Sequence, residues 1–196
     1  MDIEPDWAVA HNNLGGGFLE AGEVPDAIKQ FGLAVQIDPD YAEAQYNLGN
    51  ALWKAGRKTE AIEHYEKATV LNPDFAQAHN NLGVLLQADQ VMAAVSHYER
   101  ALQINPNYVE AHFNLGKALV QSGKDEEAIT QYQQALRLNP NYVDAHYDLA
   151  VLLAREGKVD EAFLHLQSGL KLEPNSDRFR QAMDELQRSP GAARSH

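Results

Sequence analysis

The stretch from Tyr41 to Pro73, YAEAQYNLGNALWKAGRKTEAIEHYEKATVLNP, recurs along this 196-residue chain with few changes. An acidic or amide residue followed by proline closes each copy. The closing prolines lie 33 or 34 residues apart, at Pro39, Pro73, Pro106, Pro140 and Pro174. Self-similarity at a fixed period of this length indicates an array of stacked repeats, in which each repeat contacts only its neighbours.

Composition and charge narrow the class of protein. Apolar residues make up 44 % of the chain, as in ordinary folded proteins. The formal net charge is −12, whereas nucleic acids and anionic membranes bind clustered Lys and Arg, so we expect neither as a partner. The absence of cysteine excludes disulfides and thiolate metal sites. The sequence has no apolar run long enough for a membrane span and no secretory signal, so we expect a soluble protein, with a cytoplasmic location favoured.

The proline spacing predicts how the chain is organised. We interpret residues 1–5 as the end of a preceding repeat, 175–188 as a capping helix and 189–196 as a disordered tail. Five full repeats are predicted between them, at 6–39, 40–73, 74–106, 107–140 and 141–174.

Each repeat is predicted to be a helical hairpin. In the second repeat, Ala44, Leu48 and Leu52 have helical spacing, and Gly56 follows because glycine accepts the positive φ of a helix C-terminus. A second helix then ends before Pro73, since proline disfavours the helical conformation of the residue that precedes it.

Three positions recur in every repeat and are predicted to build the core. One first-helix position is always small, where we expect the two helix backbones to approach closely: Gly15, Gly49, Gly83, Gly116 and Ala150. A large residue recurs in each second helix: Phe31, Tyr65, Tyr98, Tyr132 and Leu166. An aromatic ring opens each first helix, interpreted as a wedge between consecutive repeats: Trp7, Tyr41, Phe75, Tyr108 and Tyr142.

The third repeat departs from the pattern at its turn. It reads LLQADQVMAAVSHY where the second repeat reads LWKAGRKTEAIEHY, so one residue and the turn glycine are missing. We expect a tighter or differently shaped turn, with Asp89 or Gln90 in the left-handed conformation that glycine adopts in the other repeats.

The repeated signature NLG…A…Y…A…P resembles the tetratricopeptide repeat (TPR), over residues 1–188. The resemblance implies an all-α fold, an α-solenoid in which five TPR hairpins and a C-terminal capping helix form a right-handed superhelix with the first helices on its concave face. It also implies a protein–protein interaction scaffold. The segments AHNNLG and AHFNLGKAL are similar to repeats of O-linked N-acetylglucosamine transferases and of related bacterial TPR arrays. Because many unrelated bacterial repeat proteins share such segments, the resemblance does not imply the transferase activity for this chain.

The first-helix positions that packing does not use are predicted to face the groove. One column is rich in asparagine: Asn13, Asn47, Asn81, Asn114 and Asp148. An asparagine amide pairs with both a peptide C=O and a peptide N–H, and helices about 10 Å apart would meet every third residue of an extended peptide. In the transferase family such a ladder holds extended peptides. The other predicted peptide-binding residues are Asn12, Tyr46, Asn50, Asn80, Phe113, Lys117 and Tyr147.

An alternative explanation for the asparagine column stays open. Asparagine before Leu-Gly is common in the repeat consensus and serves helix packing or solubility in that case. A carboxylate clamp for the C-terminal tails of heat-shock chaperones is not expected, because this chain has acidic or amide residues where the clamp needs Lys and Arg.

Other kinds of site find no support in the sequence. Two histidine columns, in the first and second helices, place successive members a full repeat apart, too far to share one zinc ion: His11, His79, His112 and His146, then His64, His97 and His165. No HExxH motif, nucleophile elbow or phosphate-binding loop occurs. We therefore predict no catalytic residue, no metal and no cofactor, and not an enzyme.

The predicted function is binding of an extended peptide or a partner protein's segment in the groove. Two alternatives stay open. The chain could self-associate through its terminal repeats, because Trp7 and Val9 would otherwise face water. It could also be the recognition module of a larger enzyme such as a glycosyltransferase.

Overall fold

A computed structural model describes residues 5–188, whose regular structure is entirely α-helical. The predicted tail 189–196 and all but the last residue of the predicted remnant 1–5 lie outside the described residues. The chain divides into two compact units, unit 1 (Met1–Pro106) and unit 2 (Asn107–His196). Each unit is described by itself below.

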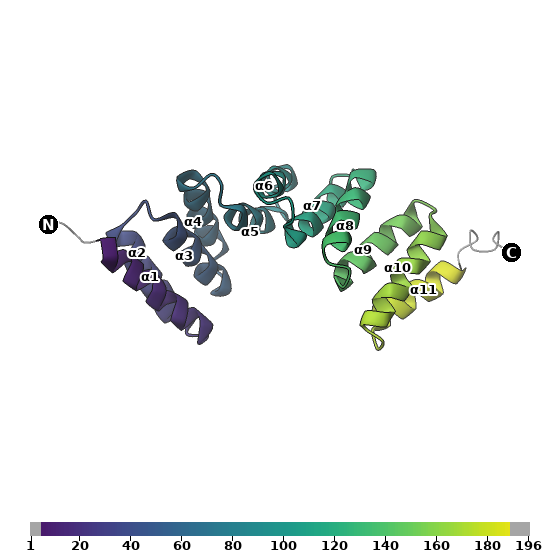
Figure 1. Cartoon of the computed structure of the whole chain (residues 1–196), viewed down its shortest axis with the longest axis horizontal. Coiled ribbons are helices and arrows are strands. Elements are labelled where there is room, and N and C mark those ends of the chain that lie inside the picture. Colours follow the sequence, from purple (N-terminus) through teal and green to yellow (C-terminus); the bar gives the residue numbers. More distant parts are fainter. Residues whose placement is uncertain (1–4, 189–196) are drawn as a thin grey trace. The chain divides into compact units, whose positions relative to one another are not determined.

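Both units are built from antiparallel helical hairpins (Figure 1). The helices of unit 1 are α1 (Pro5–Glu20), α2 (Val24–Ile37), α3 (Ala42–Lys54), α4 (Lys58–Leu71), α5 (Ala76–Leu86) and α6 (Val91–Ile104). Those of unit 2 are α7 (Val109–Gln121), α8 (Asp125–Leu138), α9 (Val143–Arg155), α10 (Val159–Leu172) and α11 (Asp177–Arg188). Within a unit, each second helix also packs against the next first helix. None of the helices in the described part of the chain has the length and apolar character needed to cross a membrane.

The turn of the second hairpin shows how a first helix ends. Gly56 has a φ of +77°, and the N–H of Arg57 donates to the C=O of Leu52 at 2.9 Å. This is a Schellman motif, in which a left-handed residue lets the chain leave the helix while a helical carbonyl stays satisfied. The turn glycine therefore has a direct conformational role.

The third hairpin turns without such a residue. Helix α5 ends at Leu86, and the N–H of Gln90 donates to the C=O of Leu86 at 2.7 Å. Gln90 has a φ of −139°, and no residue other than glycine has a positive φ between residues 5 and 188. The expectation of a left-handed Asp89 or Gln90 is therefore wrong: the missing residue shortens the loop enough to close with negative φ throughout.

The small position of each first helix lies against the large residue of its own hairpin. A Cβ atom on Gly116 would come within 2.6 Å of the Tyr132 ring, and the first three hairpins show the same contact. The close approach is thus between a helix backbone and an aromatic ring, and not between two backbones as expected. In the fifth hairpin, alanine (Ala150) accompanies the smaller Leu166, which leaves room for a methyl group.

Helix α11 covers the end of unit 2. Its Phe179 is fully buried against Gly169 of α10, where an added Cβ would lie 2.0 Å from the phenylalanine ring. At the preceding step of unit 2, the equivalent positions are both alanine, Ala135 and Ala145, and both are fully buried. The larger residue on α11, Phe179, is therefore matched by a smaller residue on α10, Gly169. The space beside this glycine forms a socket for the phenylalanine ring, which the preceding step of unit 2 lacks.

Candidate functional site

The predicted groove residues lie on the first helices of both units, but not all of them reach the surface. Asn12, Asn80 and Phe113 are only 3 %, 5 % and 8 % exposed. These three side chains therefore serve packing between helices and not contact with a ligand, because each is covered by its neighbours. The other predicted residues are half-buried or exposed: Asn13, Tyr46, Asn47, Asn50, Asn81, Asn114, Lys117, Tyr147 and Asp148.

In unit 1 the ladder asparagines bind the preceding first helix. Asn47 Nδ2 donates to Asn12 Oδ1 at 2.9 Å. Asn81 Nδ2 donates to Asn50 Oδ1 at 3.1 Å and to the Tyr46 hydroxyl at 3.3 Å. The amide N–H groups of this column therefore connect consecutive first helices. Asn81 Oδ1 also accepts from Asn80 Nδ2 at 3.2 Å, so the Asn81 amide is largely engaged within the chain, whereas Asn47 keeps one N–H and its oxygen atom.

The sequence contains a signal for this network at positions on either side of the asparagine column. The bonds join residues 35 and 31 positions apart, one more and three fewer than a repeat of 34. A ladder asparagine thus meets the positions just before and three after the ladder position of the preceding repeat. Polar residues at both of these positions, such as Asn12 and Asn50, indicate an internal network between repeats.

Two of the rings that open first helices pack on a ring of the preceding first helix, as the wedge interpretation predicts for these positions. Phe75 lies 4.7 Å from Tyr46 in unit 1, and Tyr142 lies 4.8 Å from Phe113 in unit 2, between ring centroids. Burial, aided by nearby carboxylates such as that of Glu110, raises the pKa of Tyr142 to about 12. The hydroxyl of Tyr142 is therefore a neutral hydrogen-bonding group at physiological pH.

In unit 2 a hollow of about 290 Å³ opens along α7 and α9. Three of the predicted residues line it, Lys117, Tyr147 and Asp148, together with Val151 and Arg155. Burial raises the pKa of the Asp148 carboxyl, and the Lys117 ammonium group opposes this effect. The hollow thus combines an apolar floor with charges of both signs.

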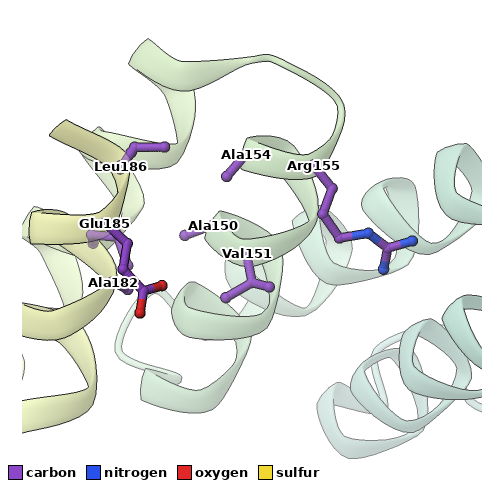
Figure 2. A pocket seen from close by; sticks show the side chains of 8 residues that line it. Ala150, Val151, Ala154, Arg155, Ala182, Glu185 and Leu186 are labelled. Atoms are coloured by element: carbon purple, nitrogen blue, oxygen red, sulfur yellow. The ribbon is translucent and has the colours of Figure 1, made fainter. Parts of the chain in front are cut away.

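A second hollow of about 290 Å³ lies between α9, α10 and α11 (Figure 2). Small side chains on facing helices, among them Ala150 and Ala182, leave this space open. Figure 2 shows Glu185 of α11 and Arg155 of α9 on opposite sides of it. Val151 and Arg155 line both hollows, so the two adjoin along α9. The contribution of α11 was missed because this helix was predicted only as a cap, and groove positions were predicted only for the five repeats.

Helix α11 also orients a predicted site residue. The ring of Tyr147 meets the ring of Phe179 edge-on, at 5.4 Å between centroids. The Arg178 guanidinium lies 5.2 Å from the Tyr147 centroid and donates to Asp144 Oδ1 at 2.7 Å. Such a cation–π contact contributes about 0.5–1 kcal/mol at exposed sites. The position of Tyr147 therefore depends on the helix that closes the unit.

The two histidine columns meet within hairpins, which the column spacing did not reveal. His79 Nδ1 lies 3.1 Å from His97 Nδ1, and His146 forms the same pair with His165 at 3.0 Å. His79 Nε2 lies 3.2 Å from the C=O of Pro73, which only accepts, so His79 is protonated on Nε2 and accepts from His97 on Nδ1. Within the described residues, no group of three or more His, Asp or Glu side chains is placed to hold a metal ion.

Comparison with known proteins agrees with this architecture. The family described as "TPR repeat" matches residues 18–56, 87–123 and 116–157, and the one described as "Tetratricopeptide repeat" matches residues 42–75. No curated protein matches the sequence. The narrower similarity to the repeats of O-linked N-acetylglucosamine transferases stays a prediction.

Several solved structures resemble the chain along most of its length. A crystal structure of MamA is 26 % identical, with a TM-score of 0.76, and covers 82 % of this chain and 94 % of its own. YrrB, described as a TPR protein with an unusual peptide-binding site, is 25 % identical with a TM-score of 0.77, and the coverages are 90 % and 92 %. PilF of Pseudomonas aeruginosa is 25 % identical with a TM-score of 0.83, and the coverages are 93 % and 83 %.

These findings confirm the predicted all-α solenoid of TPR hairpins. The family matches span more than half of the chain and fall on helices that pair as the repeat requires. The chain belongs to the tetratricopeptide-repeat family.

Proposed function

We propose that this chain is a non-catalytic interaction scaffold that binds an extended segment of a partner protein on the first-helix side of unit 2. The observation that carries the proposal is the pair of adjoining hollows along α9, which together offer an apolar floor and charges of both signs. Concave surfaces with apolar lining and a few convergent polar groups are where proteins bind ligands. The description of YrrB as a peptide-binding TPR protein supports this reading.

The chemistry of the two hollows favours a segment that carries both an acidic and a basic side chain. Lys117 can pair with a carboxylate, and Asp148 can pair with an ammonium or guanidinium group. Arg155 donates to Asp125 Oδ2 at 3.0 Å and adds positive charge at the rim of both hollows. Val151, exposed between them, offers an apolar contact to the residue in the middle. Affinity would come from the apolar contact that the ligand buries over Val151, and specificity from the charged side chains around it.

The asparagine column has a narrower role in this proposal than a full ladder. In unit 1, Asn47 donates one N–H within the chain, so a peptide would meet its second N–H and its oxygen atom, whereas the Asn81 amide both donates and accepts within the chain. Asn13 is exposed and offers its whole amide. Each amide–backbone bond adds about 0.5–1.5 kcal/mol net, so the column supplies weak binding that is indifferent to peptide side chains.

The proposal is tested by selecting linear peptides that bind the whole chain and measuring one of them by fluorescence anisotropy. Asp148→Asn and Lys117→Ala should each weaken binding by roughly fivefold to tenfold, because each removes one charged partner. The control is Gln133→Ala, an exposed position on the second helix α8, which should bind as the parent does. Binding that survives both site variants unchanged would place the peptide elsewhere.

A second candidate function, self-association, is favoured by the outer face of α1. Trp7 is 60 % exposed and Leu14 is 50 % exposed, whereas Leu48, the equivalent of Leu14 in α3, is 6 % exposed. Trp7 and Leu14 are seven residues apart and so lie on one side of the helix, and exposed apolar surface of this kind marks interaction sites. Light scattering of the chain over a range of concentrations decides the question: a Leu14-dependent dimer supports self-association, and a monomer at high concentration removes it.

A further inference from the structure

A cavity of about 620 Å³ lies between the second helices α2 and α4 of unit 1. Its apolar part includes Val35 and Val70, and Val70 is 77 % exposed although it is a large aliphatic side chain. Three carboxylates, those of Asp40, Glu63 and Glu66, line the same cavity together with one cationic side chain, that of Lys67, so its charge is predominantly negative. None of its lining residues belongs to the first-helix surface discussed above.

The next step of the same unit shows what occupies the equivalent position. Between α4 and α6, the guanidinium of Arg100 donates from Nη2 to Asp74 Oδ1 at 2.8 Å and from Nε to the C=O of Pro73 at 3.3 Å. Its Nη1 also reaches Gln103 Oε1 at 3.4 Å. In repeat register, Arg100 corresponds to Lys67, and Asp74 corresponds to Asp40.

The first step keeps the acceptors of this arrangement but lacks the guanidinium. Lys67 replaces the arginine, and no ion pair joins it to Asp40 in the described part of the chain. Its ammonium group is a compact point charge that cannot form the planar, two-sided contact of a guanidinium. Glu63 stands where the second step has a serine, Ser96, so the first step is also the more acidic of the two.

The backbone acceptor is equally available. At the second step, the C=O of Pro73 accepts from both His79 Nε2 and Arg100 Nε. At the first step, the C=O of Pro39 accepts from Gln45 Nε2 at 2.9 Å. A carbonyl oxygen accepts two hydrogen bonds, so the Pro39 oxygen retains the capacity that Arg100 uses at the second step.

We propose that the α2–α4 cavity binds an arginine side chain of a partner peptide. The guanidinium takes the place that Arg100 fills one step further on, donating to Asp40 and to the Pro39 carbonyl, while Glu63 and Glu66 supply the opposite charge. An apolar residue next to the arginine packs on Val70 and so covers this exposed side chain. This second binding surface is independent of the function proposed above, because it uses other helices of another unit.

The test uses a defined probe, the acetylated and amidated peptide Gly-Leu-Arg-Leu-Gly, with the lysine peptide Gly-Leu-Lys-Leu-Gly beside it. Methyl NMR signals of Val35 and Val70 should shift on titration with the arginine peptide. The lysine peptide should bind at least about fivefold more weakly, because it loses the bidentate geometry. Equal affinity for the two peptides, or shifts confined to unit 2, would overturn the proposal.

Two variants turn the internal comparison into a matched control. Lys67→Arg should place a guanidinium of the chain itself against Asp40 and the Pro39 carbonyl, as Arg100 lies against Asp74 and the Pro73 carbonyl, and weaken binding of the arginine peptide by at least about tenfold. Because Lys67 is exposed, this variant should retain the circular dichroism spectrum and melting temperature of the parent. Arg100→Lys should free Asp74 and the Pro73 carbonyl from the guanidinium, so that the Ile104 methyl, the counterpart of Leu71, also shifts with the arginine peptide. Unchanged peptide binding by Lys67→Arg refutes the inference.

Discussion

The substitution Gly169→Ala is expected to destabilise the chain, whereas the same substitution at Gly32 is expected to stabilise it. Both glycines lie inside second helices, in α10 and α2. A Cβ on Gly32 would meet no atom within 4 Å, but a Cβ on Gly169 would lie 2.0 Å from Cε1 of the Phe179 ring. The two substitutions therefore share the change in helix propensity and differ only in the space around the added methyl group.

The magnitude follows from these two terms. Glycine inside a helix costs roughly 0.5–1 kcal/mol relative to alanine, and Gly32→Ala should recover this amount. At Gly169 the ring would have to retreat by about 1.4 Å to restore an ordinary contact of 3.4 Å. Overpacking of a buried site costs about 1–3 kcal/mol, so the expected net loss for Gly169→Ala is up to about 2.5 kcal/mol.

The assay is urea unfolding followed by circular dichroism, with hydrogen exchange of α11 as a local readout. Faster exchange in α11 should accompany the lower free energy of unfolding of Gly169→Ala. The double variant with Phe179→Ala rebuilds the alanine pair of Ala135 and Ala145, so its loss should be smaller than the sum of the two single losses. If Gly169→Ala stabilised the chain as much as Gly32→Ala does, the argument from the Phe179 socket would be refuted.

Three further predictions concern a buried leucine, the asparagine network of unit 1 and the histidine pair of the third hairpin. Leu82→Ala should lower the free energy of unfolding by about 2–5 kcal/mol in a denaturant titration, because Leu82 is fully buried and the substitution leaves a cavity. Asn81→Ala should cost about 1 kcal/mol through its lost bonds to the preceding first helix, whereas Asn13→Ala, at an exposed position, should change stability by less than about 0.5 kcal/mol. Burial lowers the pKa of both His79 and His97, so the unfolded chain binds more protons than the folded chain below the unfolded histidine pKa of about 6.5. The free energy of unfolding should therefore fall as the pH drops below that value. His97→Gln reproduces the His–Gln pair of the first hairpin, and its thermal unfolding should show a weaker fall.

The hairpin fold was predictable because its signals are local. Helical spacing, the glycine after a first helix and the residue–proline pair after a second helix each act within a few residues, and each is found where predicted. The turn at Asp89 and Gln90 was the exception. Its conformation depends on how a shortened loop closes between two packed helices, and turn propensity does not contain that information.

The candidate site was predictable only as a set of positions. The repeat period and the helical spacing indicated which residues lie on the first helices. They did not indicate which asparagine amide would be hydrogen-bonded to a neighbouring helix. Asn47 and Asn81 looked equivalent to the exposed Asn13, yet both donate to the preceding helix. Glu185 was not predicted because its helix was interpreted only as a cap.

The amino-acid sequence by itself thus determined a stack of TPR hairpins, because helix periodicity, turn glycines and closing prolines are properties of neighbouring residues. Only the tertiary structure decided which side chains bond or pack between neighbouring helices and which remain accessible to a partner. The reason is physical: a hydrogen bond or a filled cavity depends on atoms about 3–4 Å apart that lie 31 to 35 residues apart in the chain. Arg100 and Lys67 show this most directly, since Arg100 donates to Asp74 of the preceding loop whereas Lys67, at the equivalent position, lines an open cavity.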